Sequence, residues 1–404
     1  MKTYDLISPE GTRDLIHDDC AAVRSMEKRL RKIFKSRGYS EVITPGLEFY
    51  DVFNMKSHHF PQETMYKLTD TKGRLLVVRP DSTMPIARVV STRFRDGMLP
   101  LRLFYSQTVV RNKPGMRGRS DEIRQTGIEL IGSASRRADL EVLFTAIEAL
   151  SSIEKDDFRL EIGHIGLFKE LVRRLGADAD TVENIRSLIE VKNYPALCDL
   201  LDDFKGNPAA AALKKLPRLF GEEEVFDEAE GIFSDEETNN IISELRKIYG
   251  SLTNAGFGGK IIIDLGLVNR MEYYTGIVIK GYTGGFGDAV LSGGRYDKLL
   301  SEYGYDVPAT GFAVNVDAAA KVLRRNKDYN LPHPADVLVF GRDGFETDAL
   351  IHCRKLAAEG LTAENAVWDD LEEAYAYALE RGIGRIDIIG EKVEITPVEN
   401  SETD

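Results

Sequence analysis

Residues 111–132, RNKPGMRGRSDEIRQTGIELIG, contain the pattern that decides the fold. A glycine-containing basic segment is followed by alternating polar and apolar residues, which is typical of two antiparallel strands joined by a hairpin loop. Around Gln125 and Glu129 the stretch gathers four arginines, namely Arg111, Arg117, Arg119 and Arg124. The loop is therefore a candidate anion site, although a solvated hairpin with surface arginines explains the same charges equally well.

Patterns on both sides of this hairpin predict more strands and helices. Residues 19–37 place apolar side chains on one helical face and end at Gly38, a typical helix stop. Further strands and one long helix are expected within 41–49, 68–83, 101–111, 123–132 and 138–150. Because these strands follow one another in hairpins, we expect an α+β fold. Its antiparallel sheet has helices on one side and is not a doubly wound parallel sheet.

Two changes of pattern divide the chain. From about residue 167 to 252, amphipathic helices rich in charge and leucine replace the strand pattern, which indicates a helical insertion in a core domain spanning 1–328. A linker rich in charge and proline, RRNKDYNLPHP, follows the core. Residues 334–404 then alternate strand and helix at the spacing of a small parallel α/β domain.

The charge of the chain argues against a nucleic-acid partner. Its formal net charge is −13, whereas phosphate backbones are bound by an excess of lysine and arginine. From Pro334 onward there are 6 basic and 17 acidic residues, a net charge of −11. We therefore expect no tRNA partner.

The sequence indicates neither a membrane segment nor a metal or cofactor site. No run approaches the roughly 20 apolar residues that span a bilayer, and the N-terminal residues lack an apolar signal core, so we expect a cytoplasmic protein. The three cysteines, Cys20, Cys198 and Cys353, are far apart and form no CxxC motif. The neighbouring histidines His58 and His59 would point to opposite sides of a strand.

Several short motifs occur in an order and spacing that resembles histidyl-tRNA synthetases. They are GTRD at 11–14, GYSEVITPGLE at 38–48, RPDST at 79–83, the 111–132 stretch, EYYTG at 272–276 and GGRYD at 293–297. The resemblance extends over about residues 5–325. It implies the class II synthetase catalytic fold, an antiparallel six-stranded sheet that dimerises through its first motif.

The resemblance also implies an amino-acid pocket. By position, its residues are Asp81, Thr83, Arg111, Gln125, Glu129, Tyr273 and Tyr274. Asp81 stands where the family holds the amino group of histidine, and Glu129 stands where the family faces the imidazole ring. A carboxylate suits an ammonium group, and a second carboxylate beside a tyrosine accepts an imidazole N–H.

Three positions depart from what adenylate formation needs. Asn269 and Ala318 stand where the synthetases have arginines, and Lys113 stands where they have a glutamate, although Arg111 is retained. Losing one preorganised donor typically costs about 10² to 10³ in rate. The departures therefore predict an active site without catalytic residues for aminoacylation.

With these departures the chain resembles the regulatory subunits of ATP phosphoribosyltransferase, the first enzyme of histidine biosynthesis. This resemblance implies assembly with a short-form catalytic subunit, activation of that subunit, and its feedback inhibition by L-histidine. Residues 335–398 resemble a shortened anticodon-binding domain. The alternative is an active histidyl-tRNA synthetase or a related adenylate-forming ligase.

The predicted pocket residues also have ordinary structural explanations. Asp81 and Glu129 could each pair with an arginine such as Arg79 or Arg88. If residues 272–276 were extended, neighbouring tyrosines would point to opposite faces, which would leave Tyr274 in the pocket and its neighbour in the core.

Overall fold

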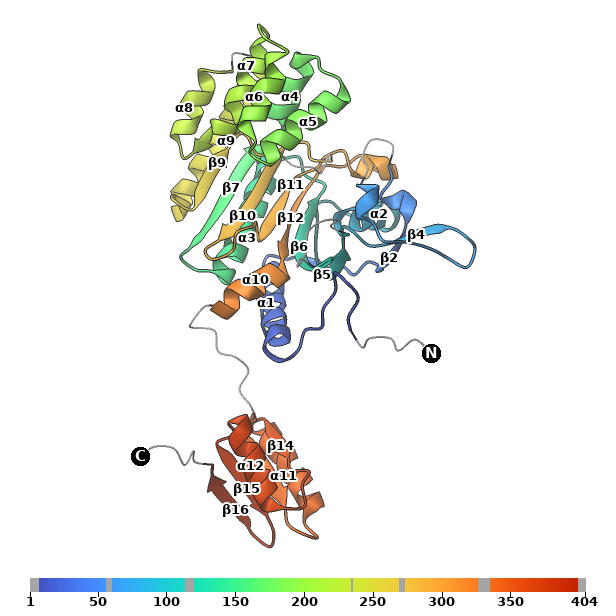
Figure 1. The fold of residues 1–404 in the computed structure, drawn as a ribbon, viewed down its shortest axis with the longest axis vertical. Coiled ribbons are helices and arrows are strands. Elements are labelled where there is room, and N and C mark those ends of the chain that lie inside the picture. The colour runs from blue at the N-terminus through green and yellow to red at the C-terminus, as the bar shows by residue number, and fades with distance from the viewer. Residues whose placement is uncertain are drawn as a thin grey trace. The chain divides into compact units, whose positions relative to one another are not determined.

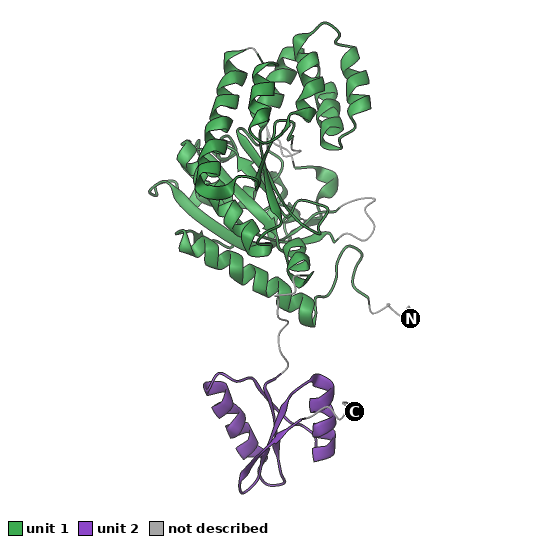
Figure 2. Ribbon diagram, turned by 90° about the vertical axis from the view of Figure 1, so that its left-hand side faces the viewer, with its two compact units in different colours: residues 1–329 green, residues 330–404 purple. Residues whose placement is uncertain are grey.

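The computed structural model describes residues 7–55, 60–112, 120–233, 235–268, 273–325 and 335–398. The chain divides into a larger unit, Met1–Tyr329, and a smaller unit, Asn330–Asp404 (Figure 2). No helix in the described ranges is long and apolar enough to cross a membrane.

Within the described residues, a nine-stranded sheet forms the centre of the larger unit (Figure 1). Its strands lie side by side in the order β1-β5-β6-β12-β11-β10-β7-β9-β8. Its strands are β1 (Ser40–Glu41), β5 (Leu101–Val110), β6 (Glu122–Ile131), β7 (Phe158–His164), β8 (Phe220–Gly221), β9 (Ile261–Asp264), β10 (Ile277–Thr283), β11 (Leu291–Arg295) and β12 (Ala309–Asn315). Every neighbouring pair from β5 to β7 in this order is antiparallel. This confirms the expected α+β fold. The parallel pairings of β1 with β5 and of β9 with β7 were not predicted.

The hairpin predicted from residues 111–132 forms between β5 and β6. The two strands pair from Leu101 opposite Ile131 to Val110 opposite Glu122. The basic tip of this hairpin, with Lys113, Arg117 and Arg119, lies outside the described residues.

Three helices cover one face of this sheet, as expected. They are α1 (His17–Ser36), α3 (Arg136–Ile153) and α10 (Val316–Arg325). The predicted apolar face of α1 is buried through Ala22, Val23, Met26, Leu30 and Phe34. Gly38 follows with a left-handed φ of 79°, which confirms the predicted stop.

The extended segment 41–49 splits at Pro45 between two sheets. Its first part pairs with β5, whereas its second part, β2 (Leu47–Phe49), joins β3 (Lys67–Thr69) and β4 (Leu75–Val78) in a three-stranded sheet. The predicted hairpin between β3 and β4 turns through Gly73, whose φ is 77°. α2 (Thr83–Arg93) follows this sheet.

The segment between β7 and β9 is mostly helical and gathers at one end of the sheet (Figure 1). Its helices are α4 (Ile165–Leu175), α5 (Ala179–Glu190), α6 (Tyr194–Asp202), α7 (Pro208–Lys215), α8 (Glu224–Glu230) and α9 (Glu236–Leu252). Side-chain caps begin five of them, because His164, Asp178, Asn193, Asn207 and Asp235 accept hydrogen bonds from backbone N–H groups of the first turn. Short 3-10 helices lie at Tyr50–Val52, Gln62–Thr64, Leu216–Arg218 and Leu300–Tyr303, and a π-helical turn lies at Thr253–Phe257.

The smaller unit is an α/β sheet with one helix packed on each face. Its elements are β13 (Val337–Gly341), α11 (Glu346–Ala358), β14 (Ala363–Asn365), α12 (Leu371–Arg381), β15 (Arg385–Ile389) and β16 (Val393–Pro397). Leu338 and Ile386 pack with α12, while Val337 and Val339 pack with α11. The strands β14, β13 and β15 are parallel, but β16 is antiparallel to β15, which the alternating pattern did not predict.

Candidate functional site

The predicted pocket lies on the sheet face away from α1, α3 and α10. Phe34 of α1 packs against Phe312 of β12, with ring centroids 5.8 Å apart, which marks the helix-covered face. Side chains alternate along a strand, so Gly311 and its partner Glu129 on β6 lie on the other face. Two predicted residues of β6, Gln125 and Glu129, therefore share this face.

Glycines in the neighbouring strands make room for the pocket side chains. A Cβ atom on Gly311 would lie 2.1 Å from Oε2 of Glu129. A Cβ atom on Gly294 of β11 would lie 2.9 Å from the ring of Tyr274. Larger residues at either position would displace the predicted site residues.

Glu129 is the buried centre of the site. Its Oε1 accepts a 2.7 Å hydrogen bond from the hydroxyl of Thr83, and its Oε2 accepts one from the hydroxyl of Tyr296. Burial raises the pKa of this carboxyl to about 8, and the nearby charge of Asp81 adds to the rise, while the two hydroxyl donors oppose it.

Asp81 is held by the start of α2. Its Oδ1 accepts a 2.9 Å hydrogen bond from the N–H of Met84, so the side chain caps the first turn of the helix. Its Oδ2 lies 3.7 Å from Nη2 of Arg111. Burial raises the pKa of Asp81, and the charge of Arg111 opposes that rise. The same arginine donates to the carbonyl of Pro80 at 2.6 Å.

The alternative of structural pairing with an arginine holds in part for Asp81, whose partner is Arg111, but Arg79 and Arg88 pair with neither Asp81 nor Glu129. Arg79 is buried, and its guanidinium donates to the backbone carbonyls of Thr44, Pro45 and Thr108. Arg88 forms an ion pair with Glu48 at 2.5 Å. Both arginines therefore build the scaffold around the pocket.

A cluster of tyrosines surrounds the two carboxylates. Tyr273 and Tyr274 are both buried, and their ring centroids are 4.9 Å apart. They precede β10 and are not part of a strand, so the expected separation onto opposite faces is wrong. Burial raises the pKa of both hydroxyls, and the charges of Asp81 and Glu129 add to the rise.

Two further tyrosines belong to the site and were not predicted. Tyr296 donates to Glu129 and packs against Tyr273, with ring centroids 5.7 Å apart. Tyr105 is fully buried on β5 opposite Gly127, and the charge of Glu129 helps to raise its pKa. Tyr296 lies in the quoted GGRYD motif, which was a signal for it in the sequence. Tyr105 shares a sheet face with Glu129, so the register of the two strands would have identified it.

Gln125 lies on the same face but at a distance from the carboxylates. It is four residues from Glu129 along β6, which corresponds to about 14 Å of strand rise. Its neighbours in the sheet are Gln107 and Asn315. The structure thus gathers Asp81, Thr83, Arg111, Glu129, Tyr273 and Tyr274, and it places Gln125 at the edge of the group.

A separate cavity adjoins the same face of the sheet near Gln125. It has a volume of about 740 Å³, and Lys280, Asp317 and Ala318 are among the residues that line it. Asp317 forms ion pairs with Arg124 at 3.0 Å and with Arg13 at 3.7 Å. These two arginines are therefore engaged by a carboxylate. Asn269 and Lys113, the other two departures from the synthetase pattern, lie outside the described residues.

Metal ligation has no support in the part of the chain that the structure describes. There, no group of three or more His, Cys, Asp or Glu side chains could hold an ion. The chemistry available at the site is hydrogen bonding and charge pairing with a small polar molecule.

Comparison with known proteins places the chain in a family. The family model of histidyl-tRNA synthetase matches residues 11–319. A histidyl-tRNA synthetase from Nostoc has the same fold, with a TM-score of 0.80 and 21% identity over 98% of this chain and 95% of that one.

Similarity is higher to proteins named ATP phosphoribosyltransferase regulatory subunit. Those of Clostridium acetobutylicum and Clostridium kluyveri are both 39% identical, covering 94% of this chain and 94% and 97% of theirs. A structure from Bacillus halodurans, described as an ATP phosphoribosyltransferase regulatory subunit/histidyl-tRNA synthetase, has a TM-score of 0.82 and 29% identity, covering 93% of this chain and 97% of that one. The chain therefore belongs to the family of ATP phosphoribosyltransferase regulatory subunits, which shares the histidyl-tRNA synthetase fold.

Proposed function

We propose that this chain is the non-catalytic regulatory subunit of ATP phosphoribosyltransferase in L-histidine biosynthesis. It binds and activates a short-form catalytic subunit and mediates feedback inhibition by histidine. The observation that supports this most is the contrast between the carboxylate pocket and the adjoining cavity. The pocket around Glu129 is built and buried, whereas Ala318, which lines the cavity, stands where the synthetases have an arginine.

L-Histidine is the proposed ligand of the carboxylate pocket. The Asp81 carboxylate suits the ammonium group, because a charge-assisted hydrogen bond contributes about 1.5 to 3 kcal/mol. Glu129 suits an imidazole N–H, and the Tyr274 ring supplies an apolar wall. Thr83 fixes Glu129 for this contact through its hydroxyl. Arg111 balances the charge of Asp81, and Gln125 contributes at the edge of the pocket.

The proposal that the chain is not a catalyst rests on the positions that contact ATP in the synthetases. Adenylate formation needs cations on the α-phosphate and on the leaving pyrophosphate. Ala318 and Asn269 supply no positive charge for this purpose, and Arg124 and Arg13 are paired with Asp317. This argument disfavours the alternative of an active synthetase.

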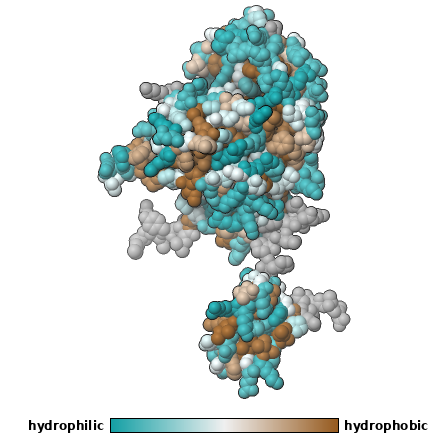
Figure 3. Space-filling model, turned by 180° about the vertical axis from the view of Figure 1, so that it is seen from behind, coloured by the Kyte–Doolittle hydropathy of each residue, from teal (hydrophilic) through white to brown (hydrophobic). Residues whose placement is uncertain are grey.

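A homodimer within a hetero-oligomer is the proposed assembly. In the three-stranded sheet, Phe49 and Leu68 both lie opposite Leu76 and so share one face with it. Leu47, Phe49 and Leu68 are 47%, 39% and 37% exposed and so form an apolar surface on this sheet. Seen from behind, the larger unit carries brown, hydrophobic patches among its hydrophilic surface (Figure 3). Such a face suits a second copy of the chain, as in the synthetases.

The smaller unit is proposed to be a shortened relative of the anticodon-binding domain that binds no tRNA. Its net negative charge would repel a phosphate backbone.

The test combines the chain with a short-form catalytic subunit and measures transferase turnover while histidine is titrated. We expect higher turnover in the mixture than in the catalytic subunit alone, and inhibition by histidine only in the mixture. Thermodynamic linkage also requires that substrates of the catalytic subunit change histidine affinity by the same factor as histidine changes theirs. A mixture with unchanged turnover and no histidine sensitivity contradicts the proposal.

A further inference from the structure

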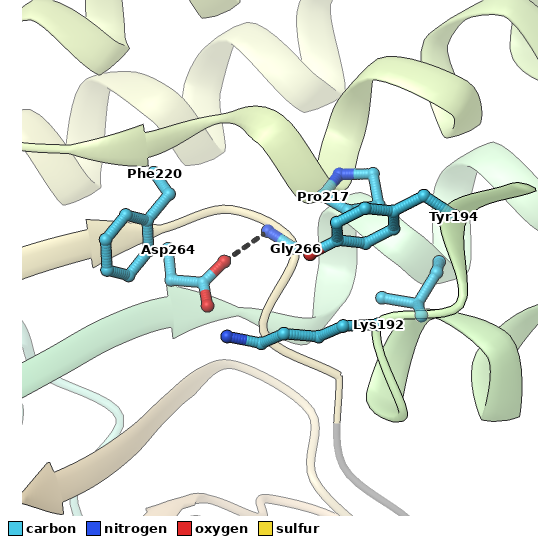
Figure 4. Close-up of a pocket in the computed structure, with 7 residues that line it drawn as sticks. Lys192, Tyr194, Pro217, Phe220, Asp264 and Gly266 are labelled. Atoms are coloured by element: carbon cyan, nitrogen blue, oxygen red, sulfur yellow. Dashed lines mark hydrogen bonds between the residues drawn. The ribbon is translucent and has the colours of Figure 1, made fainter.

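A second, smaller cavity lies on the same sheet face, where the helical segment joins the sheet. It has a volume of about 180 Å³, and its walls include Lys192, Tyr194, Pro217, Phe220 and Asp264 (Figure 4). In the sheet, β9 is the fifth strand from β6. At about 4.8 Å between neighbouring strands, this places the cavity roughly 24 Å from Glu129. It is therefore distinct from the carboxylate pocket.

Asp264 presents one carboxylate oxygen to this cavity. Its Oδ1 accepts a 2.9 Å hydrogen bond from the N–H of Gly266 and so closes the turn after β9. Its Oδ2 accepts no hydrogen bond from any described residue, and it points away from Gly266 (Figure 4). The structural role of the side chain thus uses only one of its two oxygens.

A second carboxylate lies close to Asp264 on the same face. Glu161 of β7 pairs with Ile262, two residues before Asp264 in β9, so the two acidic side chains project in the same direction. Burial raises the pKa of Asp264 to about 6, and the charge of Glu161 adds to the rise. Burial also raises the pKa of Glu161. No described lysine or arginine forms an ion pair with either of these two carboxylates.

Two lysines lie near these carboxylates without forming ion pairs with them in the described structure. The charges of Lys192 and Lys280 act to lower the pKa of both acids, but burial outweighs them. Lys280 pairs with Glu161 in the sheet and also lines the 740 Å³ cavity. Lys192 lines the small cavity, and its side chain extends toward Asp264 (Figure 4).

Lys192 lies in the turn that ends α5, where a left-handed residue is the usual helix stop. Its φ of 56° is left-handed, which is uncommon for a residue other than glycine. The turn is closed by hydrogen bonds from Lys192 N to the Ile189 carbonyl at 3.0 Å and from Asn193 N to the Leu188 carbonyl at 2.9 Å. Two residues later, Tyr194 begins α6 and forms the next part of the wall.

The remaining wall is apolar and suits a small side chain. Tyr194 and Pro217 lie together on one side, and Phe220 lies beside Asp264 (Figure 4). Phe220 is 49% exposed, which is high for a large apolar side chain. A volume of about 180 Å³ has room for a ligand of amino-acid size but is too small for a nucleotide.

We infer that this cavity binds a free amino acid. The ammonium group lies against Oδ2 of Asp264, within the field of Glu161, and the ligand carboxylate lies against Lys192. The ligand side chain packs on Tyr194 and Phe220. A zwitterion thereby pairs with the Asp264 carboxylate and with the Lys192 ammonium at once, which neither a simple cation nor a simple anion achieves. This inference is independent of the proposed regulatory role, because binding is measured on the chain alone.

The test screens the standard L-amino acids one at a time against the full chain by thermal shift, and then measures each hit by calorimetry. We expect at least one amino acid to bind saturably with one site per chain that survives Glu129→Gln, which changes only the other pocket. Asp264→Asn keeps Oδ1 for the Gly266 contact but removes the charge, and we expect it to weaken this binding about tenfold or more.

Lys192→Met supplies a second variant that leaves the Gly266 turn intact. We expect it to weaken the amino acid but to leave the affinity of the corresponding decarboxylated amine unchanged, because the amine has no carboxylate for Lys192. The inference is overturned if no amino acid binds saturably to the wild-type chain. It is also overturned if all binding disappears in Glu129→Gln, or if binding is unchanged in both Asp264→Asn and Lys192→Met.

Discussion

The hydroxyl of Thr83 donates a 2.7 Å hydrogen bond to the carboxylate of Glu129, which joins the first residue of α2 to the C-terminal part of β6. The two residues are 46 positions apart in the chain. This contact fixes the orientation of the buried acid at the centre of the candidate site. It also ties the pocket to α2, whose first turn is capped by Asp81.

Thr83 offers a matched pair of variants. Thr83→Val removes the hydroxyl while keeping the shape, so we expect Glu129 to lose a donor and histidine affinity to fall about five- to tenfold. Thr83→Ser retains the hydroxyl and should bind nearly as the wild type does. Calorimetry with L-histidine measures both. Equal affinities for the two variants would remove Thr83 from the site.

Asp81→Asn tests the ammonium contact without removing the helix cap. The amide oxygen still accepts from Met84 N, but the charge is lost, so we expect histidine to bind at least about tenfold more weakly. Asp387→Asn is the control, because Asp387 is a buried carboxylate of the smaller unit. Unchanged histidine affinity in both Asp81→Asn and Glu129→Gln would place the effector site elsewhere.

The chain should not catalyse histidine-dependent exchange of pyrophosphate into ATP. Ala318 and Asn269 supply no positive charge where the leaving group forms. The variant Asn269→Arg should remain inactive, because Ala318 and Lys113 are unchanged. A histidyl-tRNA synthetase assayed in parallel shows that the assay works. Robust exchange by the wild-type chain would establish the synthetase alternative.

Glu129 makes the stability of the larger unit depend on pH. Its carboxyl has a pKa of about 8 in the folded chain, against an ordinary value of 4.5, so between these values the folded state holds a proton that the unfolded state has released. Stability contributed by this group is therefore greatest at low pH and falls as the pH rises, by at most about 1.4 kcal/mol per pH unit. Denaturant unfolding should show a flatter profile from pH 5 to 8 for Glu129→Gln than for the wild type. Parallel profiles would show that the pKa of Glu129 is not raised.

The apolar face of the three-stranded sheet predicts a dimer at micromolar concentration. Phe49→Asp places a charge at the centre of that face and should shift the mass measured by light scattering toward the monomer. Val367→Asp is the matched control, because Val367 is 80% exposed but lies in the smaller unit. A wild-type chain that is monomeric under these conditions would contradict the proposed assembly.

Periodicity and turn signals in the sequence were enough for the architecture. The alternation in 123–132 and the apolar stripe of 19–37 report local geometry, since a strand or helix that buries one face repeats apolar residues with its own period. Residues 41–49 were predicted to be extended, but the division of this segment between two sheets was not predicted. That division depends on which strands pair, and pairing is a contact between distant parts of the chain.

The sequence by itself determined which elements form and which residue types occupy the motif positions, including Asp81, Glu129 and Ala318. Only the tertiary structure decided the partners of those residues. Arg79 binds backbone carbonyls and does not pair with Asp81, and Tyr296 donates to Glu129 across the sheet. The cavity beside Asp264 likewise combines a turn after β9 with a turn after α5. Local patterns follow from the neighbours of a residue in the chain, whereas hydrogen-bond partners and cavities follow from the register of strands that fold together from distant positions.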